Sequence, residues 1–236
     1  MCWVAPPVRL IAGGGRFWSV TKVIGLRECW GDHYNGNVVL PEGSPRMSEA
    51  TNVLRQEHDA IRRMLDASLQ AARQLERSQP VEPSVLKGLL EFFQLFADKC
   101  HHSKEEELLF PLLEKKGIPV AGGPLGVMLH EHELGRSFIA EMKAAAEAYS
   151  SGDIAAGPRW ALAARKYADV LDHHIYKENE VLFAMAEGML SQTEQHELAQ
   201  AFDKLEKEKM GAGTHERLHA QMERLLAELA PAERAQ

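Results

Sequence analysis

The sequence predicts an all-α protein, an antiparallel up-down four-helix bundle with additional C-terminal helices. Two observations predict this fold class. Apolar residues recur at the three- and four-residue spacing of an amphipathic helix over four segments, at 54–72, 86–112, 125–142 and 164–185. Short segments rich in proline and glycine separate these four segments. Because short connections join antiparallel neighbours, the four helices are expected to form an up-down bundle.

Each helix is placed by its apolar stripe and by the turn before it. The first is expected to begin near Ser48 or Thr51, either of which could cap it, and its stripe holds His58. The second follows "RSQPVEPS", and its stripe runs through positions 101, 105, 108 and 112. The third follows "KKGIPVAGGP" and holds His132. The fourth follows "SSGDIAAGP", and its stripe runs through positions 174, 178, 181 and 185.

The chain divides into three predicted parts. Residues 1–46 are rich in glycine and proline and lack a helical period, so they are predicted to form a poorly structured extension, or else to lie upstream of a natural start at Met47. Residues 47–190 are predicted to form the bundle. Residues 191–236 contain two charged helical stretches, which are expected to pack on the outside of the bundle.

Composition excludes several classes of protein. The formal net charge is −7 and the pI is about 5.9, so no nucleic-acid partner is expected. No apolar run reaches the roughly 18 residues that span a membrane, so no membrane partner is expected. The three cysteines lie far apart, which argues against a disulfide framework and favours a cytoplasmic location. The 11 histidines are many for this length and lie in clusters, which indicates metal chemistry. Monomer and homodimer are both left open.

A set of polar residues occupies inward positions of the apolar stripes. A buried charge without a partner is very costly, so these residues must satisfy one another or hold something between them. A metal ion is the favoured reading, and a network of buried His–Glu hydrogen bonds without metal is the alternative. The candidate metal ligands are His58, His101, Glu105, His132, His174 and Glu178.

The candidate ligands fall into an internal repeat. The segment "HHSKEEELLF" from His101 returns as "HIYKENEVLF" from His174, and "EH" at 57–58 returns at 131–132. The first two helices therefore resemble the second two, and a pseudo-two-fold axis would bring equivalent residues face to face. Within each half, His and Glu four positions apart share one helix face. Imidazole and carboxylate ligands without cysteine suit iron, manganese or zinc and argue against a structural zinc site.

The arrangement "EH…HHxKEExxLFP…EHExGR…HIxKExxxLF" over about residues 50–190 resembles the hemerythrin-like proteins, the HHE cation-binding domain. This resemblance implies an up-down four-helix bundle that holds a bridged, non-haem centre of two iron ions. It further implies that one iron takes His58 and His101, that the other takes His132 and His174, and that Glu105 and Glu178 bridge them. Ligand type alone does not exclude manganese or zinc.

The sequence departs from the oxygen-carrying hemerythrins, which have a His-x-x-x-His pair on the third helix. Four positions before His132 this chain has Met128, and His130 is rotated about 200° around the helix from His132. Fewer protein ligands would leave open positions on the irons. That favours binding, sensing or reduction of a small oxidant (O2, NO or peroxide), with an unidentified reductant, in a stress response. A di-iron oxidoreductase and a non-enzymatic iron or oxygen sensor that acts through partner contacts are both left open.

The polar residues beside the candidate ligands receive plainer readings. Glu57 and Glu131 are interpreted as solvated, with metal ligation as the alternative. Lys104 and Lys177 are expected to extend toward solvent or to pair along their helices. Most of the remaining polar neighbours are assigned to the surface. For the first three, hydrogen bonds that orient metal-bound imidazoles are equally expected, and metal ligation is the alternative. These neighbours are His102, His130, His173, Glu106, Glu107, His196, His215 and His219.

Overall fold

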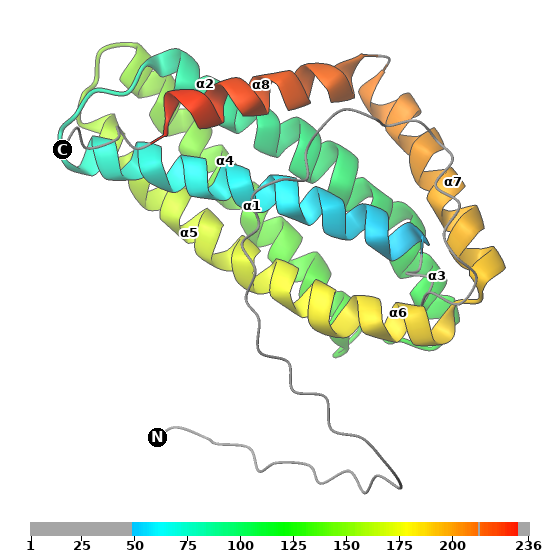
Figure 1. Ribbon diagram of the computed structural model, residues 1–236. Helices are drawn as coiled ribbons and strands as arrows, with labels where there is room; N and C mark the ends of the chain where they lie inside the picture. The colour runs from blue at the N-terminus through cyan, green and yellow to red at the C-terminus, as the bar shows by residue number, and fades with distance from the viewer. Residues whose placement is uncertain (1–48, 212, 231–236) are drawn as a thin grey trace, which may run out of the picture. The chain divides into compact units, whose positions relative to one another are not determined.

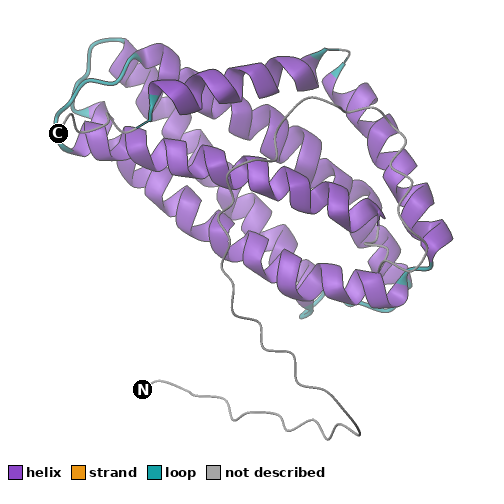
Figure 2. Cartoon of the chain, in the orientation of Figure 1, coloured by secondary structure: helices purple, strands orange, loops and turns teal. Residues whose placement is uncertain are grey.

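The computed structural model describes residues 49–211 and 213–230, which lie within the compact unit Pro45–Gln236. Every regular element in these ranges is a helix, as Figure 2 shows. The expectations for residues 1–46 and for a natural start at Met47 lie outside the described residues. None of the described helices is long and apolar enough to cross a membrane.

Four long helices form the bundle, and the predicted fold class is confirmed (Figure 1). Two of them are continuous α-helices, α1 (Glu49–Glu76) and α4 (Pro124–Ser150). The second bundle helix consists of α2 (Pro83–Phe92), η1 (Phe93–His102), η2 (Glu105–Leu109) and α3 (Phe110–Lys115), where η denotes π-helix. The fourth consists of α5 (Ala156–Lys177), η3 (Glu178–Leu182) and α6 (Phe183–Met189).

The turns between these helices contain the residues that their backbone requires. Pro83 and Pro124 stand in the first turns of α2 and α4, where a missing N–H costs no helical hydrogen bond. Gly117 and Gly152 follow the ends of α3 and α4 with φ of 104° and 98°, a region that residues with a Cβ rarely adopt. Sequence turn signals therefore place the helix ends correctly.

The bundle has two apolar cores with a polar layer between them. One core contains Met64, Phe93 and Trp160 with their neighbours, and it occupies the end of the bundle where α2 begins. The other contains Leu54 and Phe183 with their neighbours, and it includes α3 and α6. On each bundle helix the candidate metal ligands lie between residues of the first core and residues of the second. The polar layer is thus sealed by apolar side chains at both ends.

The π-helical segments shift the buried stripe by one residue. The sequence predicts that positions 181 and 185 face inward, but Val181 and Met185 are 51% and 37% exposed, and Leu182 and Ala186 are buried instead. In the same way Leu109 and Leu113, rather than positions 108 and 112, are fully buried in the second helix. A π turn holds one residue more than an α turn, so every residue after it moves around the helix. The predicted apolar stripe is therefore wrong after Glu105 in the second helix and after Glu178 in the fourth.

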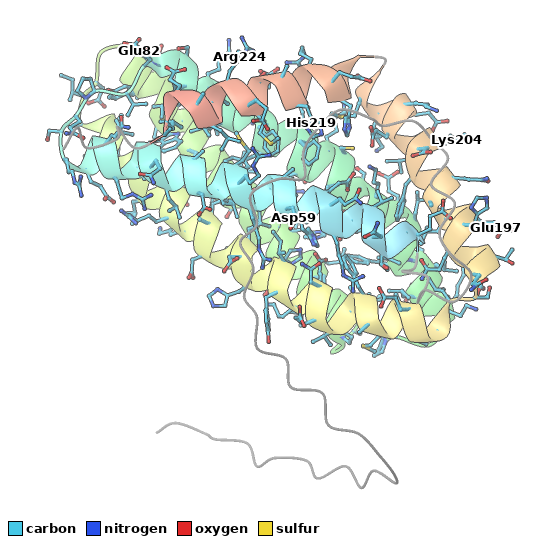
Figure 3. The ribbon with its side chains drawn as sticks, in the orientation of Figure 1. Asp59, Glu82, Glu197, Lys204, His219 and Arg224 are labelled. Carbon is cyan, nitrogen blue, oxygen red and sulfur yellow. The ribbon has the colours of Figure 1, made fainter. Side chains whose placement is uncertain are left out.

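Two further helices pack on the bundle, α7 (Gln192–Met210) and α8 (Thr214–Glu228). Helix α7 begins with a capping box between Ser191 and Glu194 and contacts α1, η1 and η2, and α8 contacts α1 and α2. Their apolar faces join the two cores. Charged side chains such as Lys204 on α7 and Arg224 on α8 lie on the outer surface (Figure 3).

Candidate metal centre

The six candidate ligands meet in the polar layer. Each is at most 1% exposed. Helix α1 supplies His58, and α4 supplies His132. The second bundle helix supplies His101 from η1 and Glu105 from η2, and the fourth supplies His174 from α5 and Glu178 from η3. Glu105 and Glu178 each stand at the first position of a π segment, so the two carboxylates occupy equivalent places in the repeat.

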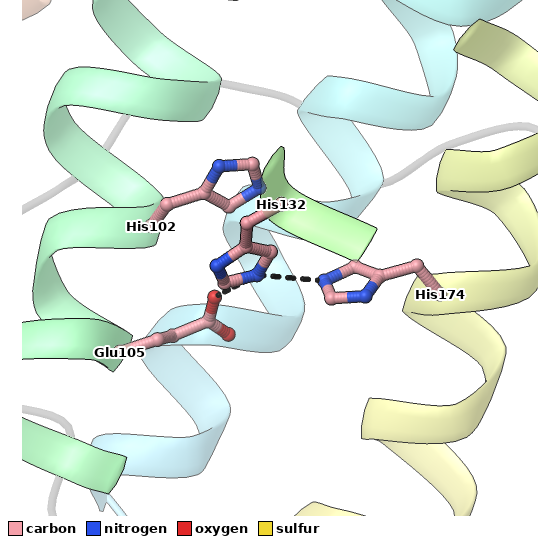
Figure 4. A group of neighbouring side chains, drawn as sticks. All are labelled: His102, Glu105, His132 and His174. Atoms are coloured by element: carbon pink, nitrogen blue, oxygen red, sulfur yellow. Dashed lines mark hydrogen bonds and ion pairs between the residues drawn. The ribbon is translucent and has the colours of Figure 1, made fainter. Parts of the chain in front are cut away.

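Each carboxylate lies between two imidazoles, one from each half of the repeat. Oε2 of Glu178 lies 3.1 Å from His58 Nε2 and 3.2 Å from His174 Nε2. The two oxygens of Glu105 lie 3.5 Å from His101 Nε2 and 3.5 Å from His132 Nε2. His132 Nε2 also lies 3.0 Å from His174 Nε2, as the dashed line in Figure 4 shows.

These donor atoms form two groups, each of which could hold a metal ion. Within each group the candidate ligand atoms lie within 4.8 Å of one another, and Glu105 belongs to both groups. The first group is His58, His101, Glu105 and Glu178, and the second is His102, Glu105, His132 and His174. A shared carboxylate between two imidazole-containing groups is the arrangement in which one side chain can bridge two ions.

The cluster contains buried polar atoms that no hydrogen bond satisfies. Both oxygens of Glu105 and of Glu178, and Nε2 of His58, are buried, and no hydrogen bond with acceptable geometry reaches them from the described residues. Leaving such atoms unpaired is costly, especially for carboxylates. These unsatisfied carboxylate oxygens and this imidazole nitrogen converge on a common space, which fits a cation, and imidazole with carboxylate fits iron.

The electrostatics of the two buried carboxylates support the same conclusion. Burial raises the pKa of Glu105 well above its ordinary value, and the nearby charge of Glu178 raises it further. Burial also acts to raise the pKa of Glu178, but its contacts with His174 and His58 outweigh this and lower it. Two neighbouring buried carboxylates cannot both stay charged without a compensating cation.

Glu57 and Glu131 hold two of the imidazoles from behind. His101 Nδ1 lies 2.8 Å from Glu57, and His174 Nδ1 lies 3.0 Å from Glu131. If each Nδ1–H donates to its carboxylate, Nε2 is left as the lone-pair nitrogen that faces the centre. Glu57 is only 7% exposed, so the interpretation of a solvated face is wrong for it. Glu57 and Glu131 occupy equivalent positions in the repeat, and this was the signal in the sequence that could have indicated their shared role.

The other two imidazoles, His58 and His132, are held in the same way through their Nδ1 atoms. His58 Nδ1 lies 2.8 Å from the side-chain oxygen of Asn179, and His132 Nδ1 lies 2.6 Å from Glu106. Arg136 also donates to Glu106, at 2.7 Å. Asn179 and Glu106 are equivalent in the repeat. The assignment of Glu106 to solvated surface is therefore wrong, because its carboxylate contacts His132.

His102 is a candidate ligand that the stripe pattern missed. A partly exposed side chain or an orienting hydrogen bond was expected, with metal ligation as the alternative. The residue is 2% exposed, and its ring stacks on His132 with 3.9 Å between centroids (Figure 4). Nδ1 contacts Asp98 at 3.3 Å, while Nε2 is buried without a hydrogen-bond partner. The π-helical turns of η1 bring His101 and His102 inward together. The repeat held a signal for this, because the equivalent Ile175 is apolar and buried.

The remaining neighbours divide between buried and exposed. Lys104 is 1% exposed, so its expected extension toward solvent is wrong, whereas the Lys177 side chain is 37% exposed. His215 was expected to face solvent, but its imidazole is half-buried and lies 2.8 Å from Glu206. The residues whose exposure agrees with their surface assignment are His130, His173, His196 and His219.

Replacing His102 by alanine is expected to weaken binding of one metal ion by at least ~10-fold, because one buried donor nitrogen is removed from the second group. A matched replacement of the exposed His130 should leave affinity unchanged. Anaerobic titration of the metal-free protein with ferrous iron, in competition with a chelator, measures both. Equal affinities for the two variants would show that His102 is not a ligand.

Comparison with known proteins agrees with this geometry. The sequence profile of the hemerythrin HHE cation binding domain matches residues 49–186. The chain belongs to this family. The predicted resemblance to this family is therefore confirmed. The match ends within α6, the last segment of the bundle, and does not include α7 and α8.

The hemerythrin-like chain is also similar to several curated bacterial proteins. It is 32% identical over 133 residues to the iron-sulfur cluster repair protein YtfE of Dickeya chrysanthemi (strain Ech1591), which covers 55% of this chain and 60% of that protein. It is 29% identical over 148 residues to the iron-sulfur cluster repair protein DnrN of Neisseria gonorrhoeae, which covers 61% of this chain and 92% of that protein. The chain thus spans about 60% of the length of the YtfE protein and most of DnrN.

Proposed function

We propose that this hemerythrin-like protein binds two iron ions in the polar layer as a bridged pair. One ion would be held by His58 and His101, the other by His132 and His174 with His102, and Glu105 and Glu178 would bridge them. The observation that carries the proposal is the pair of fully buried donor groups that share Glu105. Manganese or zinc would suit the same donors, so the identity of the metal belongs to the test.

The residues around the centre form an apolar surrounding that suits the binding of small molecules. Stacked aromatic rings lie against two imidazoles, Phe183 against His58 and Phe110 against His132, with centroids 5.5 and 5.9 Å apart. Together with the two apolar cores, these rings exclude bulk water. The iron pair, when bound, would supply electrons to a small ligand at open positions. The protein itself orients the imidazoles and limits access to molecules as small as O2, NO or peroxide.

We further propose a role in the response to oxidative or nitrosative stress, in a reducing cytoplasm. The names of the relatives as iron-sulfur cluster repair proteins support this role. Damaged iron–sulfur proteins would then be its clients, and a cellular reductant would return the irons to the ferrous state. The widely spaced cysteines support the location.

Mixing the anaerobic ferrous protein with O2, NO or hydrogen peroxide tests the oxidant. An oxidoreductase should consume many equivalents of oxidant when a reductant is supplied, whereas a sensor should bind about one equivalent and stop. The non-enzymatic alternative is favoured by α7 and α8, since these charged helices lie outside the family match and offer a partner surface. If iron-loaded protein neither binds nor consumes any of the three oxidants, both forms of the proposal are wrong.

A second assay tests the repair role. Iron-loaded protein is incubated anaerobically with a client whose [4Fe–4S] cluster has been damaged by peroxide, together with sulfide and a thiol. Faster return of the client's cluster absorption than with an equal amount of free ferrous iron supports the role. A rate equal to that with free iron contradicts it.

A further inference from the structure

The two halves of the centre differ in what lies behind them. In the first half, the Lys104 ammonium contacts Glu57 and also lies 2.6 Å from Oε2 of Glu206, which α7 supplies. In the second half, the equivalent Lys177 contacts Glu131, and its side chain is 37% exposed. Among the described residues, no additional helix covers Lys177. Helix α7 thus breaks the pseudo-symmetry of the bundle at Lys104. This lysine contacts Glu57, the carboxylate that lies beside the candidate ligand His101.

The contacts of the first half form a continuous chain from α8 to the metal centre. His215 on α8 lies 2.8 Å from one oxygen of Glu206, and the other oxygen contacts Lys104. Lys104 contacts one oxygen of Glu57, whose second oxygen lies 2.8 Å from His101 Nδ1. Each link is an ion pair or charge-assisted hydrogen bond, and Lys104 and Glu57 are buried, so solvent does not compete for them.

Removing α7 would leave Lys104 with one carboxylate partner and expose it to water. Lys104 would then be free to leave Glu57, and Glu57 would hold His101 less firmly. A carboxylate that orients a metal-bound imidazole raises its basicity and fixes its direction, and loss of such a partner typically weakens metal binding by roughly 10–100-fold. Glu206 lies two residues further out than Glu57, because Lys104 stands between them, so its loss should act at the lower end of that range.

We infer that Glu206 is a positioning residue for His101, so that docking of α7 on the bundle and binding of a divalent cation beside His101 stabilise each other. The inference rests on the metal centre proposed above. Coupling between two sites is reciprocal: whatever α7 contributes to metal affinity, metal must contribute to α7 docking. The cation position beside His174 has no such link and should be independent of α7.

Glu206→Gln tests the metal side of the coupling. The substitution keeps the size of the side chain and removes its charge. Titration of full-length, metal-free protein with cobalt(II), followed by its visible d–d absorption, is expected to show affinity for one of two bound ions falling ~10-fold while the other stays unchanged. The spectrum of the weakened ion should also shift, because the orientation of His101 changes. His215→Gln, which leaves Glu206 in place, should act in the same direction with a smaller effect.

Lys209→Gln is the matched control. Lys209 also holds α7 to the bundle, 2.7 Å from Glu107, but this contact does not reach a candidate ligand. The control should leave both cobalt affinities and the spectrum unchanged. A loss of affinity in Lys209→Gln equal to that in Glu206→Gln would show that general packing of α7 is responsible and would overturn the positioning role.

Hydrogen exchange measured by mass spectrometry tests the effect of metal binding on the docking of α7. Cobalt binding should slow exchange in peptides from α7 of the wild-type protein, and this protection should be lost in Glu206→Gln. If wild type binds two ions and Glu206→Gln matches it in affinity, spectrum and exchange, only the coupling is refuted. If wild type binds no cobalt and no iron, the metal centre is refuted and the coupling with it.

Discussion

Replacing Glu105 and Glu178 together by alanine is expected to abolish iron binding. Both side chains are 0% exposed, and both lie between imidazoles from opposite halves of the bundle. Their removal takes away both carboxylates and leaves only neutral imidazoles, which bind ferrous iron weakly. Wild-type protein should carry about two irons per chain and show the visible absorption of a bridged diferric centre. The double variant should show neither by metal analysis or spectroscopy.

The matched control is the double replacement of Glu107 and Glu180 by alanine. These two glutamates are also equivalent in the repeat, two positions after the buried pair, but both are exposed. The control should keep the full iron content and absorption of the wild type. Stoichiometric iron retained in the Glu105→Ala, Glu178→Ala variant would refute the assignment of the centre, provided that far-UV circular dichroism shows the helices intact.

Removing metal is expected to lower the melting temperature by at least about 10 °C. A ligand present at 1,000 times its dissociation constant stabilises the folded state by ~4 kcal/mol per site. In a domain of 150–250 residues, each kcal/mol shifts the melting temperature by roughly 2–4 °C. The metal-free centre also keeps buried carboxylates without hydrogen-bond partners, which weakens the bundle further. Calorimetry before and after anaerobic treatment with a chelator, followed by iron readdition, measures the change.

The Glu105→Ala, Glu178→Ala variant serves as control for this experiment as well. Chelator and iron should leave its melting temperature unchanged, since no site remains to link binding to folding. A wild-type protein whose melting temperature is the same with and without its metal would contradict a centre that spans all four bundle helices. It would favour the alternative of buried His–Glu hydrogen bonds that need no ion.

Helix number, order and connection were predictable from the amino-acid pattern because they depend on local properties. Three- and four-residue apolar spacing marks each amphipathic helix, and proline and glycine mark its ends. The internal repeat made the candidate ligands predictable as well. It singled out His101 and Glu105 against their polar neighbours, since His174 and Glu178 occupy the same places. The structure brings all six residues chosen in this way into one buried layer.

Other features depend on contacts between helices, so the pattern along one helix could not reveal them. The π segments place Leu182 and Ala186 in the core in place of Val181 and Met185. An added residue in a helical turn is tolerated only where contacts with the surrounding helices stabilise it. The same irregularity buries His102 beside His101. Spacing counted at 3.6 residues per turn assumes that no such turn exists.

Polar contacts across the bundle are the other part that spacing does not reveal. Glu57, Glu106, Lys104 and Glu206 look like ordinary charged residues of helix surfaces, and two of them are fully or almost fully buried. Their roles arise from partners 26 to 102 positions away in the sequence. A charged side chain is stable in the interior only when such partners meet it there, and the packing of four bundle helices and α7 determines whether they do.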